Sequence, residues 1–256
     1  MRKKLVSLFV GILSLLVSGA ALAQVPVAGG EQPISKPILI LFLLLVLSLS
    51  PFILMMTTSF VKIAVVLSLV RQAMGTQQIP PNQIVTGLAL ILTVYVMIPV
   101  GQDVYQKTSD IIHQTETSED VLSSASVNML KKALDAGKEP VRSFLLKHIH
   151  DQERKLFYGL GRKSGMDKAE GGFSDKDFIV LIPGFVISEL SEAFQIGFVI
   201  FLPFLVLDMV VSNILLSMGM FQLSPITVSL PFKLLLFVLV DGWYLITKGL
   251  VAGYMN

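Results

Sequence analysis

The chain has 256 residues, of which 53% are hydrophobic and 15% are charged, and its formal net charge is +2. Because soluble domains carry roughly 25% charged residues, this composition indicates a protein associated with a membrane. The small net charge, without a basic stripe, argues against nucleic acid as a partner. The absence of cysteine excludes disulfides, thiol catalysis and iron–sulfur ligation.

An export signal is predicted at the N-terminus. Residues 2–4 are basic, residues 5–20 form an apolar run, and Ala21-Leu22-Ala23 fits the small-x-small rule for signal-peptide cleavage. We therefore expect residues 1–23 to be removed, residues 24–36 to form a linker, and the mature N-terminus to lie outside the cytoplasm. The alternative is an uncleaved first transmembrane helix, but the run is short for a span.

A first hydrophobic helical hairpin is predicted at residues 37–102. Residues 37–61 carry no charge, and this run is longer than the roughly 20 residues that a bilayer core requires. Pro51 is expected to kink or split it. A turn with tandem prolines at residues 75–82 leads to an uncharged return arm at residues 83–102.

Two cations interrupt the first arm, Lys62 and Arg71. At about 100° per residue they point to opposite sides of one helix, so they do not form a cationic face. Either they flank the membrane on its cytoplasmic side, or each pairs with an acid on another helix. The sequence leaves both interpretations open.

A polar segment follows at residues 103–177 and carries 13 of the 18 acids and 12 of the 20 bases. Interleaved charges and an amphipathic pattern over residues 126–146 predict a small helical domain on the periplasmic side. His148 and His150 are two residues apart and would not face the same way on a helix. No nucleophile elbow, phosphate loop or dinucleotide fingerprint is present. We expect no metal, no cofactor and no enzymatic activity.

A second hydrophobic hairpin is predicted at residues 178–256, with a central loop at residues 219–225. A charge inside such apolar arms is costly unless it has a partner or faces water. We therefore predict that neighbouring subunits shield the charges of both hairpins: Lys62, Arg71, Glu189, Glu192, Asp208, Lys233 and Asp241. Ala193 and Gly197 form a small-xxx-small pair that lets another helix come close.

Several stretches of the two hairpins are long and specific: TSFVKIAVVLSLVRQAMGTQQIPPN, GLALILTVYVMIPV, SELSEAFQIGF, LPFLVLDMVVSNILLSMG and SPITVSLPFKLLLFVLVDGW. In these stretches the chain resembles the export-gate family of type III secretion, which includes the flagellar FliP proteins and the virulence R components (SctR). QQIPPN, YVMIP and VVSNILL look more like the virulence branch, whereas the signal peptide looks more like the flagellar one. We favour a virulence injectisome.

The resemblance implies an all-α membrane-associated subunit that assembles as a helically staggered ring, a homo-pentamer with S- and T-type subunits (FliQ and FliR in flagella). Further expected partners are the U-type switch protein and the basal-body ring. Such a ring encloses the entry channel for unfolded protein substrates, at the periplasmic side of the bacterial inner membrane. The alternative function is that of a lone multipass transporter with a periplasmic loop.

The resemblance also implies a gasket that narrows the closed pore, formed here by Met220, Phe221 and Gln222. The family usually has successive methionines in this loop, so Phe221 and Gln222 are departures. Ser191 is a third departure, because many members carry a basic residue after the S-E-L motif. Any ion pair assigned to that base is therefore absent from this chain.

Overall fold

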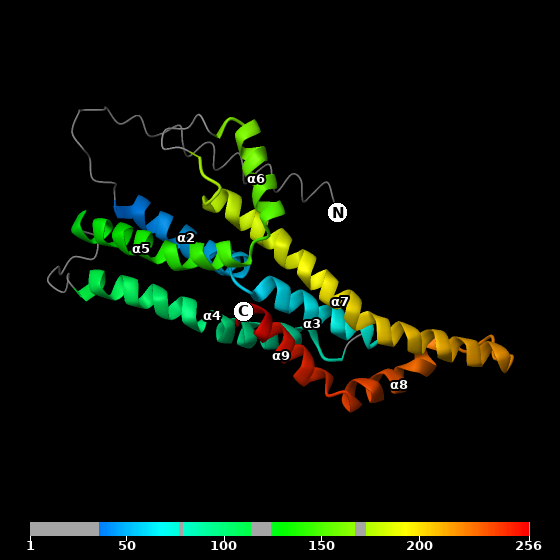
Figure 1. The fold of residues 1–256 in the computed structure, drawn as a ribbon. Helices are drawn as coiled ribbons and strands as arrows, with labels where there is room; N and C mark the ends of the chain where they lie inside the picture. The colour runs from blue at the N-terminus through cyan, green and yellow to red at the C-terminus, as the bar shows by residue number, and fades with distance from the viewer. Residues whose placement is uncertain (1–35, 77–78, 114–123, 167–172, 256) are drawn as a thin grey trace, which may run out of the picture. The chain divides into compact units, whose positions relative to one another are not determined.

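The structure is a computed structural model that describes residues 36–76, 79–113, 124–166 and 173–255. All of the elements in this part of the chain are helices, which confirms the all-α prediction (Figure 1). They are α2 (Lys36–Thr57), α3 (Phe60–Ala73), α4 (Asn82–His113), α5 (Ser124–His148), α6 (Asp151–Lys163), α7 (Phe178–Ser217), α8 (Pro225–Leu239) and α9 (Gly242–Met255).

The chain divides into two compact units, residues 1–44 and residues 45–256. The predicted signal peptide at residues 1–23 and nearly all of the predicted linker lie outside the described residues. The first unit is therefore described only over the start of α2. Everything that follows concerns the second unit.

The first apolar arm is split into α2 and α3, which meet at an angle of 68°. The sequence predicts a kink or split at Pro51, but the arm splits at Thr58 and Ser59. Pro51 leaves the carbonyl of Leu47 without its helical N–H donor, and the hydroxyl of Ser50 donates to that carbonyl instead, at 3.0 Å. This local replacement lets the proline remain inside α2.

The predicted boundary at residue 102 lies inside α4, which continues without a break from the apolar arm into the polar segment. The polar helices do not stand apart from the hydrophobic ones. α5 packs against α4 and α7, and α6 packs against α7. The polar segment therefore contacts the second hairpin directly.

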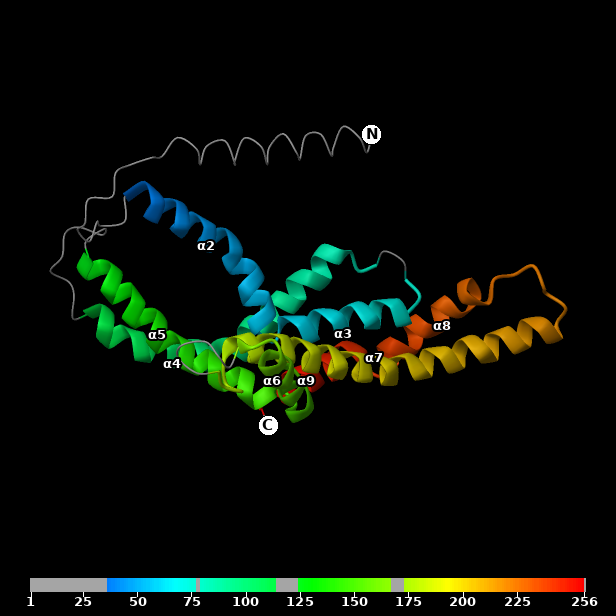
Figure 2. The ribbon, with the colours of Figure 1, turned by 90° about the horizontal axis from the view of Figure 1, so that it is seen from above.

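The second hairpin consists of the 40-residue helix α7, the loop of residues 218–224 and α8 (Figure 2). α7 ends in a Schellman motif, in which Met220 N–H donates to Leu215 C=O (2.9 Å) and Gly219 N–H to Leu216 C=O (3.0 Å). Gly219 supplies the positive φ of 74° that this motif requires. The loop between α7 and α8, residues 218–224, overlaps the loop that the sequence predicts at residues 219–225.

A second break, which sequence reasoning missed, separates α8 from α9 by a bend of 59°. Asp241 occupies it with a φ of 51°, a left-handed conformation that Asp tolerates better than most residues. The next residue, Gly242, packs so closely against the Phe237 ring that a Cβ at this position would lie 2.3 Å from it. Trp243 meets the same ring edge to face, at 5.3 Å between centroids.

The core is built around α3, which packs most extensively against α7 and also against α4. Its residues Ile63, Val66 and Val70 are fully inaccessible to solvent. α4 and α7 are each long and apolar enough to cross a membrane, and up to four spans result if each bent pair counts as one. Both small residues of the predicted packing pair on α7 are buried, and Leu69 of α3 approaches Gly197.

Replacing Gly197 by alanine is expected to destabilise the fold. The added Cβ would lie 2.3 Å from Leu69 Cδ1 and 3.3 Å from Leu69 Cβ, so the Leu69 side chain must turn away and its Cβ must move slightly. Such overpacking lowers the free energy of unfolding by about 1–3 kcal/mol. Gly249→Ala in α9 is the matched control, because its Cβ meets no described atom within 4 Å and alanine favours helix by up to about 1 kcal/mol.

Thermal unfolding of both variants in mild detergent, followed by circular dichroism, measures the difference. Equal stability of the two variants would contradict a tight α3–α7 contact at Gly197.

Candidate functional site

A buried cluster of charged groups lies where α3, α7 and α9 meet. Lys62 Nζ on α3 lies 3.2 Å from Glu189 Oε1 and 2.6 Å from Glu192 Oε2, both on α7. The side chain of Glu189 is completely inaccessible and that of Lys62 is 5% exposed. Tyr254 on α9 donates its hydroxyl to Glu189 Oε2. The buried ammonium group thus bridges the fully buried Glu189 and the partly exposed Glu192, and the phenol hydroxyl adds a hydrogen bond to Glu189.

The cluster continues into the polar segment through His150, which lies between α5 and α6. Its Nε2 is 2.7 Å from Glu192 Oε1, and its Nδ1 is 3.7 Å from Glu153 Oε2. Its backbone N–H donates to the hydroxyl of Ser188 on α7, at 3.0 Å. The junction of α5 and α6 is therefore held against α7 by the side-chain contact between His150 and Glu192 and by one backbone hydrogen bond.

Aromatic rings cover the cluster on the side of α5 and α9. Lys62 Nζ lies 4.4 Å from the centroid of the Tyr254 ring, a cation–π contact. Phe144 and His148 of α5 pack against the same ring, with centroids 6.1 Å and 5.0 Å away. Partial burial, with Lys62 and Lys147 nearby, lowers the pKa of His148 to about 4. His148 is therefore neutral at physiological pH and acts as an aromatic neighbour.

A second polar link ties the two arms of the second hairpin together. Asp208 on α7 accepts from Lys233 Nζ at 2.6 Å and from Ser229 Oγ at 2.5 Å, both on α8. Lys233 is buried, and its ammonium group also lies close to Gly75, just beyond the end of α3. This link holds α8 to α7 and brings the Lys233 ammonium group next to the turn that follows α3.

The structure thus brings five of the seven predicted charges together within one chain: Lys62 joins Glu189 and Glu192, and Lys233 joins Asp208. Arg71 instead contacts neutral groups, the Asn82 side chain and the Pro80 carbonyl. Asp241 is exposed at the α8–α9 break and has no ion pair among the described residues. Contacts of these charges with neighbouring subunits stay a prediction.

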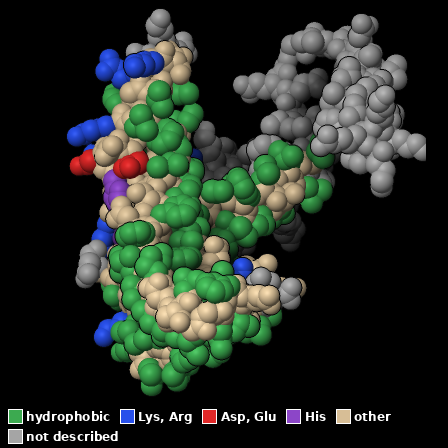
Figure 3. All heavy atoms as spheres, turned by 90° about the vertical axis from the view of Figure 1, so that its right-hand side faces the viewer, with side chains coloured by type: hydrophobic (Ala, Val, Ile, Leu, Met, Phe, Trp, Pro, Cys, Tyr) green, Lys and Arg blue, Asp and Glu red, His purple; other side chains and the backbone are tan. Residues whose placement is uncertain are grey.

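The tip of the second hairpin is apolar and open. Met220, Phe221 and Gln222 are all exposed, and Phe221 is exposed over 76% of its surface. Met218 and Leu223 flank them and are also exposed. Viewed from this end of the molecule, hydrophobic side chains cover most of the surface, and charged side chains gather along one edge (Figure 3). Such a large apolar surface marks contact with lipid or with other proteins.

Sequence reasoning missed three members of these polar groups: Tyr254, His150 and Ser229. Tyr254 and Ser229 lie in apolar stretches where nothing local distinguishes them from other residues. His150 was examined only as a metal ligand and not as a partner for an acid. Its closeness to two carboxylates depends on how α6 crosses α7, which the sequence does not reveal.

Comparison with known proteins places the chain among components of secretion systems. It matches the family model described as the FliP family over residues 43–250. It is 46% identical over 215 residues to the Yop proteins translocation protein R of Yersinia pestis, covering 84% of this chain and 95% of that protein. It is 42% identical over 223 residues to the flagellar biosynthetic protein FliP of Bacillus subtilis, covering 87% and 94%. It is 39% identical over 208 residues to the hypersensitivity response secretion protein HrcR of Ralstonia nicotianae, covering 81% and 93%.

Lys62→Met is expected to destabilise the chain strongly, because it leaves the buried Glu189 carboxylate without its cation. Breaking one side of a buried ion pair lowers the free energy of unfolding by about 3–5 kcal/mol. The double variant Lys62→Met/Glu189→Gln removes both charges and should recover much of that loss. Unfolding in detergent measures both variants, and a double variant no more stable than the single one would show that the pair does not hold the helices together.

Proposed function

The chain belongs to the FliP family, and from that premise we propose that it is a core subunit of the export gate in a bacterial type III secretion system. The family supplies structural components of the secretion apparatus and is not a family of enzymes. We propose that the system is a virulence injectisome. Sequence identity alone does not separate the virulence branch from the flagellar branch, since the flagellar FliP at 42% lies between virulence proteins at 46% and 39%. The stretches QQIPPN, YVMIP and VVSNILL support the injectisome.

The observation that carries this proposal is the placement of charge in the apolar hairpins. Lys62, Glu189, Asp208 and Lys233 are satisfied inside the chain, while large apolar side chains of α7 and α8 face outward. A subunit of this kind can bury its outer faces against lipid and other subunits without desolvating a free charge. These faces are suited to repeated side-by-side packing in a closed ring.

We propose that the ring contains five copies with a helical stagger and includes the S- and T-type companions. The U-type switch protein and the basal-body ring would contact this assembly from outside. Three carboxylates remain accessible for contacts between subunits. The side chains of Glu192 and Asp208 are 35% and 34% exposed, and Asp241 is exposed as well. Arg71 is available for the same purpose.

We place this assembly in the inner membrane, at its periplasmic side and within the basal body. The chain is a membrane protein by the apolar length of its helices, and the predicted export signal supports a periplasmic N-terminus. α7 has 40 residues, or about 60 Å at 1.5 Å per residue, against the roughly 30 Å of a hydrocarbon core. A helix of that length is suited to a subunit that extends well beyond the bilayer.

The exposed loop at the tip of the second hairpin is suited to the gasket role. Copies of Met220, Phe221 and Gln222 arranged around a ring would bring flexible and aromatic side chains to its centre. Methionine adapts to gaps of variable shape, whereas Phe221 supplies a larger and stiffer apolar surface. This gasket would therefore rely less on adaptable methionine than that of its relatives.

The alternative of a lone transporter has weaker support. Such a protein needs a polar substrate site near the middle of the membrane. In the described part of the chain, Lys62 and Lys233 are already bound by carboxylates of the same chain. This arrangement leaves neither ammonium group free to bind a polar substrate.

The full-length protein purified in mild detergent is expected to give a multimer of about five chains by native mass spectrometry, in keeping with a ring-like assembly. A monomer as the main species would contradict the ring.

Asp208→Ala should lower the yield of the multimer, because it leaves the buried Lys233 ammonium without a carboxylate. Asp208→Ala/Lys233→Met is the control that removes both charges and should restore much of the yield.

Replacing Met220 and Phe221 by glycine should let small solutes leak through the assembled gate while the multimer still forms. The reason is that the loop would lose the apolar side chains proposed to fill the closed pore. Permeability of cells that express the complete gate measures the leak. Leu223→Gly is the matched control, because Leu223 is an exposed apolar residue of the same loop outside the proposed gasket. An unchanged permeability in the double variant, or an equal leak in the control, would remove the gasket role of residues 220–222.

A further inference from the structure

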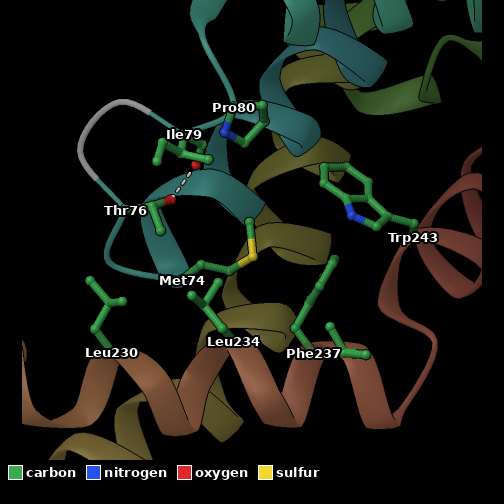
Figure 4. Close-up of a pocket in the computed structure, with 9 residues that line it drawn as sticks. Met74, Thr76, Ile79, Pro80, Leu230, Leu234, Phe237 and Trp243 are labelled. Carbon is green, nitrogen blue, oxygen red and sulfur yellow. Dashed lines mark hydrogen bonds between the residues drawn. The ribbon is translucent and has the colours of Figure 1, made fainter.

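An apolar pocket lies between the turn that follows α3 and the α8–α9 bend (Figure 4). Its volume is about 520 Å³, within the roughly 300–1,000 Å³ range of ligand pockets. The lining residues are Met74, Thr76, Ile79, Pro80, Leu230, Leu234, Phe237, Val238 and Trp243. A smaller cavity of about 210 Å³ adjoins it and shares Pro80 and Trp243.

The lining of this pocket is almost entirely apolar. Its polar side-chain groups are the indole N–H of Trp243 and the hydroxyl of Thr76, and that hydroxyl already donates to the carbonyl of Ile79 at 2.5 Å (Figure 4). The mouth is apolar as well, because Ile79 and Val238 are each exposed over more than 70% of their surface. A polar ligand would therefore find little compensation for its lost hydration, whereas a hydrocarbon chain fits.

A cation lies at the edge of the same pocket. The Arg71 guanidinium contacts the Asn82 side chain and the carbonyl of Pro80, a lining residue. These partners are neutral, and no carboxylate forms an ion pair with Arg71 among the residues that the structure describes. Lys233, the other cation near this turn, is bound by Asp208. Arg71 therefore keeps its full positive charge for an external anion.

The pocket also has the features of a membrane interface. It lies where the apolar helix α3 ends, next to Arg71 and Thr76. Trp243, an amphipathic side chain of the kind enriched at membrane–water interfaces, lines its wall. An acyl chain could thus enter from the bilayer while its head group stays at the level of Arg71.

From these observations we propose that this pocket binds one acyl chain of an anionic phospholipid, whose phosphate pairs with Arg71. The guanidinium fork matches the oxygen atoms of a phosphate diester. The lipid would fill the space between the α3–α4 turn and α8, beside the link between Lys233 and Asp208. A zwitterionic lipid can place the same chain in the pocket, but it lacks the net negative charge that Arg71 attracts.

The only tryptophan of the chain provides the test, because it lines the pocket. The full-length protein is reconstituted into vesicles that contain phosphatidylcholine or phosphatidylglycerol brominated in the acyl chains, and quenching of Trp243 fluorescence is measured. Brominated phosphatidylglycerol should quench at lower mole fraction, with an apparent affinity about fivefold higher, as expected for one cation near an anionic lipid.

Arg71→Gln should abolish that preference, whereas Arg71→Lys should retain most of it. The lysine variant keeps the charge but loses the guanidinium fork, so it separates lipid binding from any structural role in the turn. Leu234→Phe should reduce quenching by both lipids, because the larger ring occupies the pocket. Lys248→Gln removes a cation from α9 that does not line the pocket and should change nothing.

Equal quenching by the two lipids in the unchanged protein would overturn the proposal, because it would show that Trp243 merely faces the bilayer. Weak quenching by both would also overturn it and would indicate that a helix of another subunit covers the pocket. A preference that persists in Arg71→Gln would assign head-group recognition to another residue and contradict the role of Arg71.

Discussion

A buried ammonium group shared between two carboxylates is the interaction on which the arrangement of the helices depends. Lys62 and Glu189 are almost completely removed from water, and such a pair is stable only while its partners stay in place. Those partners come from α3, α7 and α9, and His150 extends the cluster to the junction of α5 and α6. The electrostatic requirement therefore brings helices that are distant along the chain to one point, and it connects the polar segment to the apolar hairpins.

The same principle shapes the second hairpin, where the polar groups lie between the arms and the apolar ones face outward. Asp208, Ser229 and Lys233 meet across α7 and α8, while the outer faces of both helices expose large hydrophobic side chains. Soluble proteins rarely expose apolar surface of this extent. This arrangement suits a subunit whose outer surface meets lipid and other subunits, as membership of the FliP family implies.

The breaks in the helices show how far local chemistry can be predicted. The loop after α7 was predicted at residues 219–225, and Gly219 there adopts the left-handed conformation that glycine takes readily. Asp241 adopts a similar conformation at the end of α8, yet an aspartate inside an apolar run was interpreted as a buried charge and not as a helix end. Pro51 was expected to kink or split its helix, but α2 continues through it, and the neighbouring hydroxyl of Ser50 satisfies the carbonyl that the proline leaves free. Each error arose where one residue had two possible local roles.

The all-α fold, the loop that ends α7 and the need to shield the charges of the apolar arms follow from the sequence, because apolar periodicity, prolines and glycines act over a few neighbouring residues. The partners of those charges do not follow from it. Lys62 meets Glu189, and Glu189 meets Tyr254, across distances along the chain that no local pattern bridges. The sequence-based prediction assigned the shielding of these charges to neighbouring subunits. The packing of α3 and α9 against α7 instead supplies much of that shielding within one chain. Only the three-dimensional path of the backbone decides which buried groups come within hydrogen-bonding distance.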